Sequence, residues 1–359
     1  MNNIHLRPNP IVGAMYTLRD MNIDVIVMHG PPGCGFMASR MLEEAGVRVV
    51  TTGMKDDDLV FGASEPLIRT LKTVSKKFDP RTVAVVGTCA SMIIGEDIGM
   101  AIKRANIGCN VFPVDCHGCM GDNTIGAVAA VQAGRNAGLL SCEEAERQTS
   151  LMHAATDMER KRGMARKEYM SPVRGPTKMK VAKAIVDTLR DGKKVAVAMM
   201  AKKELAYRFA DIFLAVNDAR TALGGETFFT ANLDSGFGLP RIRRYADDIM
   251  NELTSNNVSI DRVIGGLDEY AVVGERMRAA VDDHIPDLLV LTGIPHAYPG
   301  YSANDVLITD QPRQLANYLE DGCCLAVGEI SSHSMVMNTR HIIRSETGDT
   351  IRELTEECG

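Results

Sequence analysis

Short apolar runs alternate along the chain with longer stretches in which apolar positions recur every three or four residues. The first pattern predicts buried β-strands, and the second predicts amphipathic helices such as Glu65–Phe78 and Leu239–Leu253. The expected strands are Asp24–Met28, Val47–Thr52, Thr82–Val86, Asn110–Pro113, Lys194–Met199, Glu226–Ala231, Arg262–Gly265, Asp287–Thr292 and Cys324–Gly328. Strands that alternate with helices indicate doubly wound parallel sheets, and therefore several Rossmann-like α/β domains.

Two breaks in this pattern suggest domain boundaries. Residues Asn123–Met170 have a mostly helical pattern and end in a Lys/Arg-rich stretch. The segment Ser171–Lys178, SPVRGPTK, follows with two prolines and a glycine, which is typical of a linker. A weaker boundary lies at Asn256–Asp261. The expected organisation is an α/β domain with a helical extension at 1–170, a second α/β domain at 171–255 and a third at 256–359.

The composition limits the possible partners and compartments. A net charge of −6 argues against nucleic acid or an anionic membrane as the main partner. The chain has no uninterrupted apolar run long enough to span a membrane, and its first residues lack the apolar core of a signal peptide, so we expect a cytoplasmic protein. Nine cysteines are many for that compartment, where stable disulfides are rare, and they favour metal binding or redox chemistry.

The segment His29–Phe36, HGPPGCGF, follows directly after an expected strand. It is similar to a phosphate-binding loop but lacks the lysine and hydroxyl residue that hold the phosphates and magnesium. We therefore expect the chain itself to bind no ATP. The segment instead presents Cys34 between Gly33 and Gly35. Glycines allow a bulky ligand to approach the backbone, and a thiolate placed in this way suits an iron–sulfur cluster.

Two further segments place cysteines after strands. Cys89 follows Thr82–Val86 in the segment VGTCASMIIGED, although a single cysteine at a strand end more often serves packing. Cys116 and Cys119 occur in DCHGCMGDN, and their spacing is that of half a zinc site. No second Cys/His pair follows at the usual distance, so simple cluster ligation by this pair is the less favoured interpretation.

In combination, these segments resemble the catalytic (component 1) subunits of nitrogenase and nitrogenase-like enzymes. Their order and spacing agree with that family over the first third of the chain, and one local match follows later at Ile294–Tyr301. The matching segments are Val12–Tyr16, His29–Phe36, Met54–Gly62, Cys89–Ile98 and Phe112–Gly118.

The resemblance implies a set of cluster ligands. Two family ligand positions correspond to Cys34 and Cys89, whereas the place of a third family cysteine is taken by Asn9. With two ligands in each chain, a homodimer would complete one [4Fe–4S] cluster on its two-fold axis. Cys116 and Cys119 are not needed in this arrangement, so we expect a variant with serine at both positions to keep its iron.

The resemblance also suggests where a substrate would bind. No cysteine lies between Cys142 and Cys323, which argues against a nitrogenase-type iron–molybdenum cofactor. His296 takes the place of the family's cofactor-facing histidine, although it could equally be a hydrogen-bonded structural residue. His296 and His117 are candidate proton donors. Three arginines are candidates for binding substrate carboxylates, or else form a solvated helix start: Arg241, Arg243 and Arg244.

Within the superfamily, the short chain and the two-cysteine pattern are most similar to the branch that reduces Ni-sirohydrochlorin a,c-diamide, a nickel tetrapyrrole, and closes a lactam ring in coenzyme F430 biosynthesis. That branch implies a separate ATP-hydrolysing reductase, itself an iron–sulfur protein, that docks on the homodimer and delivers electrons. The alternatives are another nitrogenase-like reductase, of the protochlorophyllide or sulfur-compound type, and a non-catalytic iron–sulfur scaffold.

Overall fold

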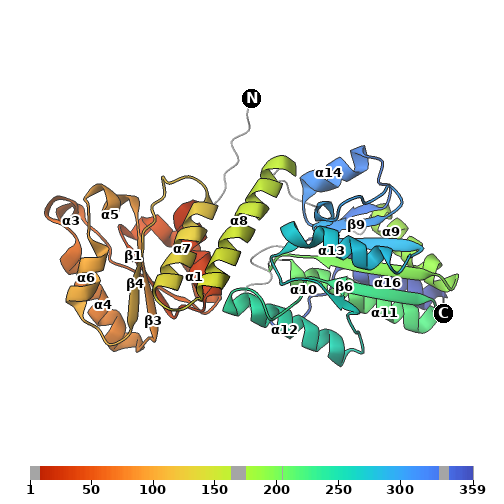
Figure 1. The fold of residues 1–359 in the computed structure, drawn as a ribbon, viewed down its shortest axis with the longest axis horizontal. Coiled ribbons are helices and arrows are strands. Elements are labelled where there is room, and N and C mark those ends of the chain that lie inside the picture. Colours follow the sequence, from red (N-terminus) through yellow and green to blue (C-terminus); the bar gives the residue numbers. More distant parts are fainter. Residues whose placement is uncertain (1–8, 163–174, 204, 331–338, 359) are drawn as a thin grey trace. The chain divides into compact units, whose positions relative to one another are not determined.

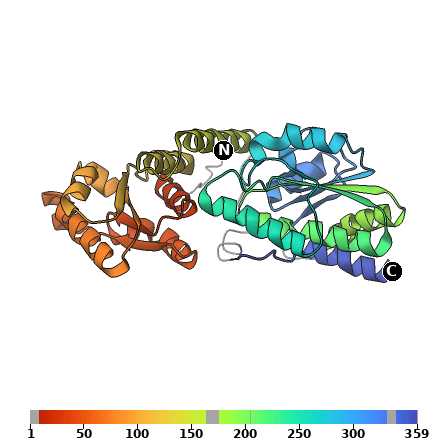
Figure 2. The same cartoon turned by 60° about the horizontal axis from the view of Figure 1, so that its bottom comes forward.

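The computed structural model describes residues 9–162, 175–203, 205–330 and 339–358. The chain divides into two compact units, each shown in Figures 1 and 2. The first consists of Met1–His153 with Leu239–Arg241, and the second of Ala154–Gly238 with Ile242–Gly359. Half of the expected linker, residues 171–174, lies outside the described residues, and the remainder, 175–178, forms the start of the helix Pro176–Arg190.

The first unit is built on a sheet of four parallel strands in the order β2-β1-β3-β4. Its strands are β1 (Val25–His29), β2 (Arg48–Thr51), β3 (Thr82–Gly87) and β4 (Asn110–Val114). Its helices are α1 (Pro10–Asp20), α2 (Phe36–Glu44), α3 (Asp56–Phe61), α4 (Ser64–Phe78), α5 (Cys89–Ile93), α6 (Ile98–Ala105), α7 (Asn123–Asn136) and the first part of α8 (Cys142–Arg162), with a 3-10 turn η1 (Pro32–Gly35). The chain leaves β1 toward β2 and then returns to β3, so the strand order reverses between β1 and β3.

Helices cover both faces of this sheet (Figure 1). α4 and α6 pack on one face through buried residues such as Leu71, and α1 and α7 lie together on the other. The close approach of α1 and α7 requires glycine at two positions. A Cβ atom at Gly13 would lie 2.1 Å from the Asn123 carbonyl oxygen, and one at Gly126 would lie 1.8 Å from that of Pro10. These contacts fix the start of α1 against the start of α7.

The second unit contains a six-stranded parallel sheet in the order β10-β9-β8-β5-β6-β7. Its strands are β5 (Lys194–Met200), β6 (Glu226–Ala231), β7 (Arg262–Val263), β8 (Leu288–Gly293), β9 (Val306–Thr309) and β10 (Ala326–Gly328). Its helices are α9 (Pro176–Arg190), α10 (Ala206–Phe209), α11 (Asp211–Leu223), α12 (Pro240–Ser255), α13 (Tyr270–Asp282), α14 (Pro312–Glu320) and α16 (Glu346–Cys358), with a 3-10 turn η2 (Pro295–Ala297). Here the strand order reverses between β5 and β8.

The structure confirms the expected α/β class with parallel, doubly wound sheets. The expected boundary between 171–255 and 256–359 runs through a single sheet, because β8 pairs directly with β5. These two segments therefore belong to one compact unit. The strand β9 was not predicted from the sequence, although all four of its residues are buried.

Candidate metal centre

Cys34 lies in the 3-10 turn η1, directly after β1, and its side chain is exposed. A Cβ atom at Gly35 would lie 2.0 Å from the Met28 sulfur, so any larger residue there would require the Met28 side chain to move. A Cβ atom at Gly33 would meet no atom within 4 Å, which leaves space beside the cysteine. Desolvation of the thiol, and then the nearby Cys89, raise the pKa of Cys34.

Cys89 is the first residue of α5, directly after β3, and it is half-buried. Thr88 caps this helix: its backbone N–H donates to the Ser91 hydroxyl at 2.8 Å. The Thr88 hydroxyl donates in turn to the carbonyl of His29 at 2.9 Å, which ties the loop after β3 to the loop after β1. Cys34 and Cys89 thus follow the two strands between which the strand order reverses, where open α/β sheets bind ligands.

The loop between β4 and α7 brings His117 and Cys119 to the same place. The sulfurs of Cys119 and Cys89 are 3.6 Å apart, and a donor atom of His117 lies within 4.8 Å of both. The hydrogen bond to Cys89 is the main cause that raises the pKa of the exposed Cys119 thiol. Of the Cys116/Cys119 pair that the sequence analysis singled out, only Cys119 therefore joins Cys89 and His117 in space, and this contact with Cys89 was not predicted from the sequence.

Two neighbouring residues differ from this group. Cys116 is buried, and its burial, followed by the charge of Asp115, raises the pKa of its thiol to about 12. Asn9 caps α1 by accepting a hydrogen bond from the Val12 N–H at 3.0 Å. A Cβ atom at Gly118 would lie 3.3 Å from the Cys89 sulfur and 3.9 Å from the Asn9 amide nitrogen. The Asn9 amide, at the position where the family resemblance places a third cysteine, thus lies near the same loop residue as the Cys89 sulfur.

Comparison with known proteins identifies relatives of this chain. A family model described as nitrogenase component 1 type oxidoreductase matches residues 10–150. The Ni-sirohydrochlorin a,c-diamide reductive cyclase complex, component CfbD, of Methanosarcina acetivorans is 42% identical over 99% of this chain and 98% of its own length. Its counterparts from Methanothermobacter thermautotrophicus and Methanocaldococcus jannaschii are 41% and 39% identical, each over 97% of this chain and 98% of their own lengths.

The chain belongs to the CfbD family. The resemblance to nitrogenase component 1 proteins that the first third of the sequence carries is thereby confirmed. None of the helices in the described residues has the length and apolar character needed to cross a membrane.

Behind the cysteines of this CfbD-family chain lies a buried polar pair that sequence reasoning missed. His29, the last residue of β1, is fully buried, and its Nδ1 lies 3.2 Å from the Thr52 hydroxyl. Its Nε2 lies 3.8 Å from Oε2 of Glu96, which also accepts a hydrogen bond from the Ser64 hydroxyl, while Oε1 of Glu96 accepts one from the Ala63 N–H. Burial lowers the pKa of His29, although Glu96 opposes the shift. This pair links the two cysteine loops to the start of α4.

The predicted arginines lie at the start of α12. Helical spacing places Arg241 and Arg244 on one side of the helix and directs Arg243 elsewhere. Arg243 is exposed and donates from Nε to the Ser235 carbonyl at 2.8 Å. The guanidinium of Arg244 lies 5.7 Å from the centre of the Tyr245 ring. These contacts do not test whether the three arginines bind substrate, so that role stays a prediction.

His296 lies in η2, directly after β8, and is buried. Its Nδ1 is 3.1 Å from the Tyr318 hydroxyl of α14. β8 is one of the two strands between which the strand order of the second sheet reverses. His296 thus occupies the position in the second sheet that Cys34 and Cys89 occupy in the first, which is where a ligand site is expected.

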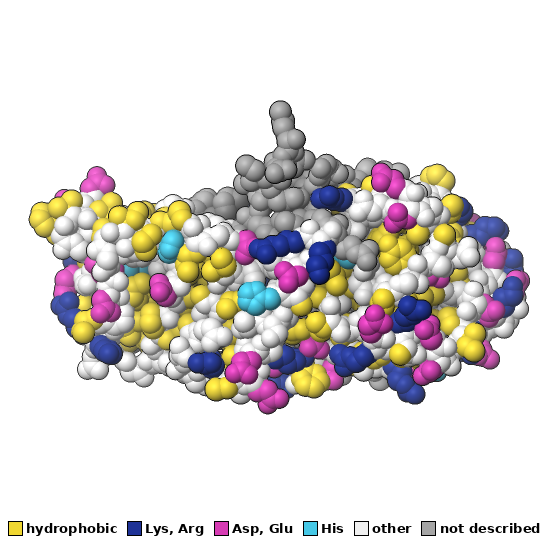
Figure 3. Space-filling view, turned by 45° about the horizontal axis from the view of Figure 1, so that its top comes forward, with side chains coloured by type: hydrophobic (Ala, Val, Ile, Leu, Met, Phe, Trp, Pro, Cys, Tyr) yellow, Lys and Arg dark blue, Asp and Glu magenta, His cyan; other side chains and the backbone are white. Residues whose placement is uncertain are grey.

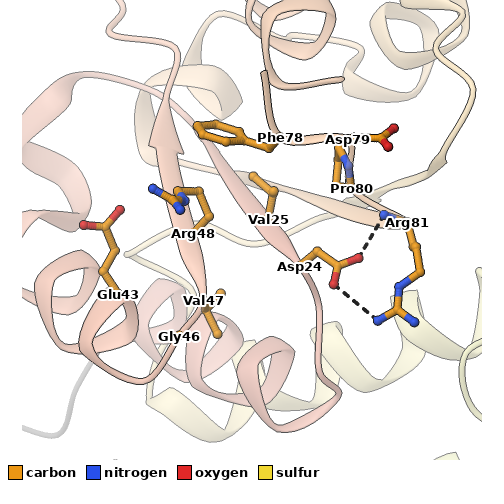
Figure 4. A pocket seen from close by; sticks show the side chains of 10 residues that line it. All are labelled: Asp24, Val25, Glu43, Gly46, Val47, Arg48, Phe78, Asp79, Pro80 and Arg81. Carbon is orange, nitrogen blue, oxygen red and sulfur yellow. Dashed lines mark hydrogen bonds and ion pairs between the residues drawn. The ribbon is translucent and has the colours of Figure 1, made fainter. Parts of the chain in front are cut away.

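A cavity of about 530 Å³ opens at the amino ends of the strands of the first sheet, opposite the ends that carry Cys34 and Cys89 (Figure 4). Two of its charged lining residues have partners within the unit: Asp24 accepts from the backbone of Arg81, and the Arg48 guanidinium lies 4.8 Å from the centre of the Phe78 ring. Because ligands of open α/β sheets bind at the carboxyl ends of the strands, we assign this cavity no part in the metal centre.

Proposed function

We propose that this chain is the catalytic component of an ATP-dependent, nitrogenase-like reductive cyclase. Its substrate would be Ni-sirohydrochlorin a,c-diamide, whose ring system is reduced while a side chain closes as a lactam in coenzyme F430 biosynthesis. The observation that carries the proposal is the similarity of 39–42% identity over nearly the whole chain to three cyclase components of this name. The cysteines after β1 and β3 support it, because they offer thiolates where such a sheet binds its ligand.

The proposed cofactor is a [4Fe–4S] cluster held by Cys34 and Cys89 of two copies of the chain. When bound, the cluster would relay electrons toward the tetrapyrrole. Thiolates are the ligands that such clusters use, and both thiols can be reached from solvent. Their binding to iron requires them to lose their protons, so cluster assembly releases protons. Four terminal ligands with two from each chain make the homodimer part of the site.

The proposed electron donor is a separate ATP-hydrolysing iron–sulfur protein of the nitrogenase-reductase (CfbC) type. A patch of exposed apolar side chains on α3 and α5 supports a docking surface for it. The patch consists of Leu59, Val60, Phe61, Met92 and Ile93, with exposed fractions from 40% to 86%. Figure 3 shows hydrophobic side chains gathered at this end of the first unit. α5 begins at Cys89, so a partner seated on this patch would lie close to the cluster.

Replacing Phe61 by serine is expected to weaken binding of the reductase about tenfold or more, because exposed aromatic residues carry much of the binding energy at interfaces. Binding would be measured anaerobically by light scattering or interferometry with nucleotide-loaded reductase. Ile285→Ser is the matched control, since Ile285 is 82% exposed but lies in the second unit. Equal losses in both variants, or none in Phe61→Ser, would argue against this surface.

The chain itself is expected to bind no nucleotide, because the HGPPGCGF loop has neither the lysine nor the hydroxyl residue that holds phosphate and magnesium. Calorimetry with Mg-ATP on the isolated protein should show no specific heat. A micromolar site would contradict the assignment of ATP hydrolysis to the partner.

The complete function is tested by anaerobic absorption spectroscopy of this chain with Ni-sirohydrochlorin a,c-diamide, the reductase and ATP. The tetrapyrrole spectrum should change only when all components are present. A tetrapyrrole spectrum that stays unchanged, while protochlorophyllide or a sulfur compound is reduced, would replace the proposed cyclase by another nitrogenase-like reductase. Cluster binding without any tetrapyrrole binding would indicate a scaffold.

A further inference from the structure

The distances among Cys89, His117 and Cys119 fit a single metal ion better than a cluster. Two thiolates on one tetrahedral ion, each about 2.3 Å from the metal, lie ~3.8 Å apart. The sulfurs of Cys89 and Cys119 are 3.6 Å apart. The thiolates of a [4Fe–4S] cluster each bind a different iron and point away from one another, so they lie farther apart. This pair could not hold two corners of a cluster without moving apart.

We propose that Cys89, His117 and Cys119 form a mononuclear site for a borderline divalent ion, Zn²⁺ or Fe²⁺, in the chain that has not yet received its cluster. Two thiolates and one imidazole, with a fourth position open to water, are a donor set that binds such ions. The inference rests on the proposed function in one respect, because the cluster uses the same Cys89 thiolate. The single ion and the cluster are therefore alternative states of the same centre.

The local structure favours access and preorganisation. Cys119 is exposed and the other two residues are half-buried, so an ion can enter from solvent. The Cys119 N–H points to Nδ1 of His117 at 3.4 Å, which holds the imidazole beside the thiol. A Cβ atom at residue 118 would lie 3.3 Å from the Cys89 sulfur, so Gly118 lets the loop lie against that sulfur.

The ligand set excludes two other cysteines. Cys116 is buried and does not belong to the group of donor atoms that lie within 4.8 Å of one another. Cys34 also lies outside this group, although it is one of the two proposed cluster ligands. This difference makes the two states separable by mutation: Cys34 serves only the cluster, Cys119 only the single ion, and Cys89 both.

The test begins with cluster-free protein prepared without oxygen and titrated with Co²⁺, whose absorption reports tetrahedral thiolate coordination. We expect one Co²⁺ per chain, displaced by Zn²⁺ or, less readily, by Fe²⁺. Mutation of a residue that only hydrogen-bonds to a metal ligand typically weakens metal binding about 10–100-fold. Cys119→Ser removes a ligand itself and should weaken Co²⁺ binding by more than this, and His117→Ala should weaken it as well. Cys116→Ser is the control and should bind Co²⁺ like the parent.

Reconstitution with iron and sulfide then separates this inference from the proposed function. Cys34→Ser should lose the cluster and keep the Co²⁺ site, Cys119→Ser should show the reverse, and Cys89→Ser should lose both. One equivalent of Zn²⁺ should slow cluster assembly in the parent but not in Cys119→Ser. Normal Co²⁺ binding by Cys119→Ser, or loss of its cluster, would overturn the single-ion site. A parent chain that takes up no cluster would instead contradict the proposed function, whatever the Co²⁺ result.

Discussion

Replacement of Cys34 or Cys89 by alanine is expected to abolish the iron–sulfur centre. Each substitution acts on both copies of the chain, so a cluster on the two-fold axis would lose two of its four thiolates at once. The anaerobically purified variants should contain almost no sulfide and should lack the broad visible absorption of the cluster, and their iron should fall far below that of the parent. The parent should contain one cluster for every two chains.

Cys109 provides a matched control for this experiment. It is half-buried in the same unit, but it precedes β4. It therefore lies at the amino ends of the strands, whereas the proposed ligands lie at their carboxyl ends. Cys109→Ala should keep the full iron content. Full iron content in Cys34→Ala and Cys89→Ala would disprove the ligand assignment, and one cluster per single chain in the parent would disprove the sharing between copies.

Much of the fold follows from local sequence patterns. β1 and β3 are uninterrupted apolar runs of strand length, and α4 has its apolar residues on one face, so the pattern alone locates them. β9 is different, because Val306–Thr309 is a short run that directly follows a polar turn. Its place in the sheet comes from pairing with β8 on one side and β10 on the other. The run VLIT between polar segments is itself a strand signal that sequence reasoning missed, whereas its neighbours in the sheet are not encoded locally.

The strand order, which is not encoded locally, also explains why the sequence suggested a domain boundary near residue 256. The chain reaches β7 at one edge of the sheet and then returns to place β8 beside β5. A turn-rich segment at such a return is indistinguishable in sequence from a linker. The size of the second unit is therefore set by strand order, which local composition does not encode.

The positions of the candidate ligands in the fold were predictable where they follow strands directly. Cys34 and Cys89 come after β1 and β3, so the rule for strand ends applies to them without further information. For the third segment, the two cysteines of CHGC look equivalent in sequence, and Cys116 is the nearer to its strand. The fold buries Cys116 and turns Cys119 toward Cys89. Which of the two cysteines faces Cys89 is thus set by the path of the loop in three dimensions and not by the local sequence.

His296 is expected to matter for turnover but not for the cluster. It lies after β8 at the reversal of strand order in the second sheet, and we propose that it donates a proton during reduction of the macrocycle. General acid catalysis by a positioned side chain contributes about 10²–10⁴-fold. His296→Ala should therefore lower turnover within that range while iron content and the homodimer persist. Turnover would be measured with excess reductase, ATP and Ni-sirohydrochlorin a,c-diamide.

Two further variants separate proton donation from positioning. His296→Gln keeps much of the side-chain volume and can still form a hydrogen bond, but it cannot act as an acid near neutral pH, so its turnover should stay close to that of His296→Ala. Tyr318→Phe removes only the hydroxyl that lies 3.1 Å from Nδ1 and keeps the ring packed edge-on against Tyr301, so it should lose less activity. Thermal unfolding of all three identifies any loss caused by a damaged fold. If His296→Ala and His296→Gln turn over like the parent, the histidine supports the structure alone, and the proton comes from another group.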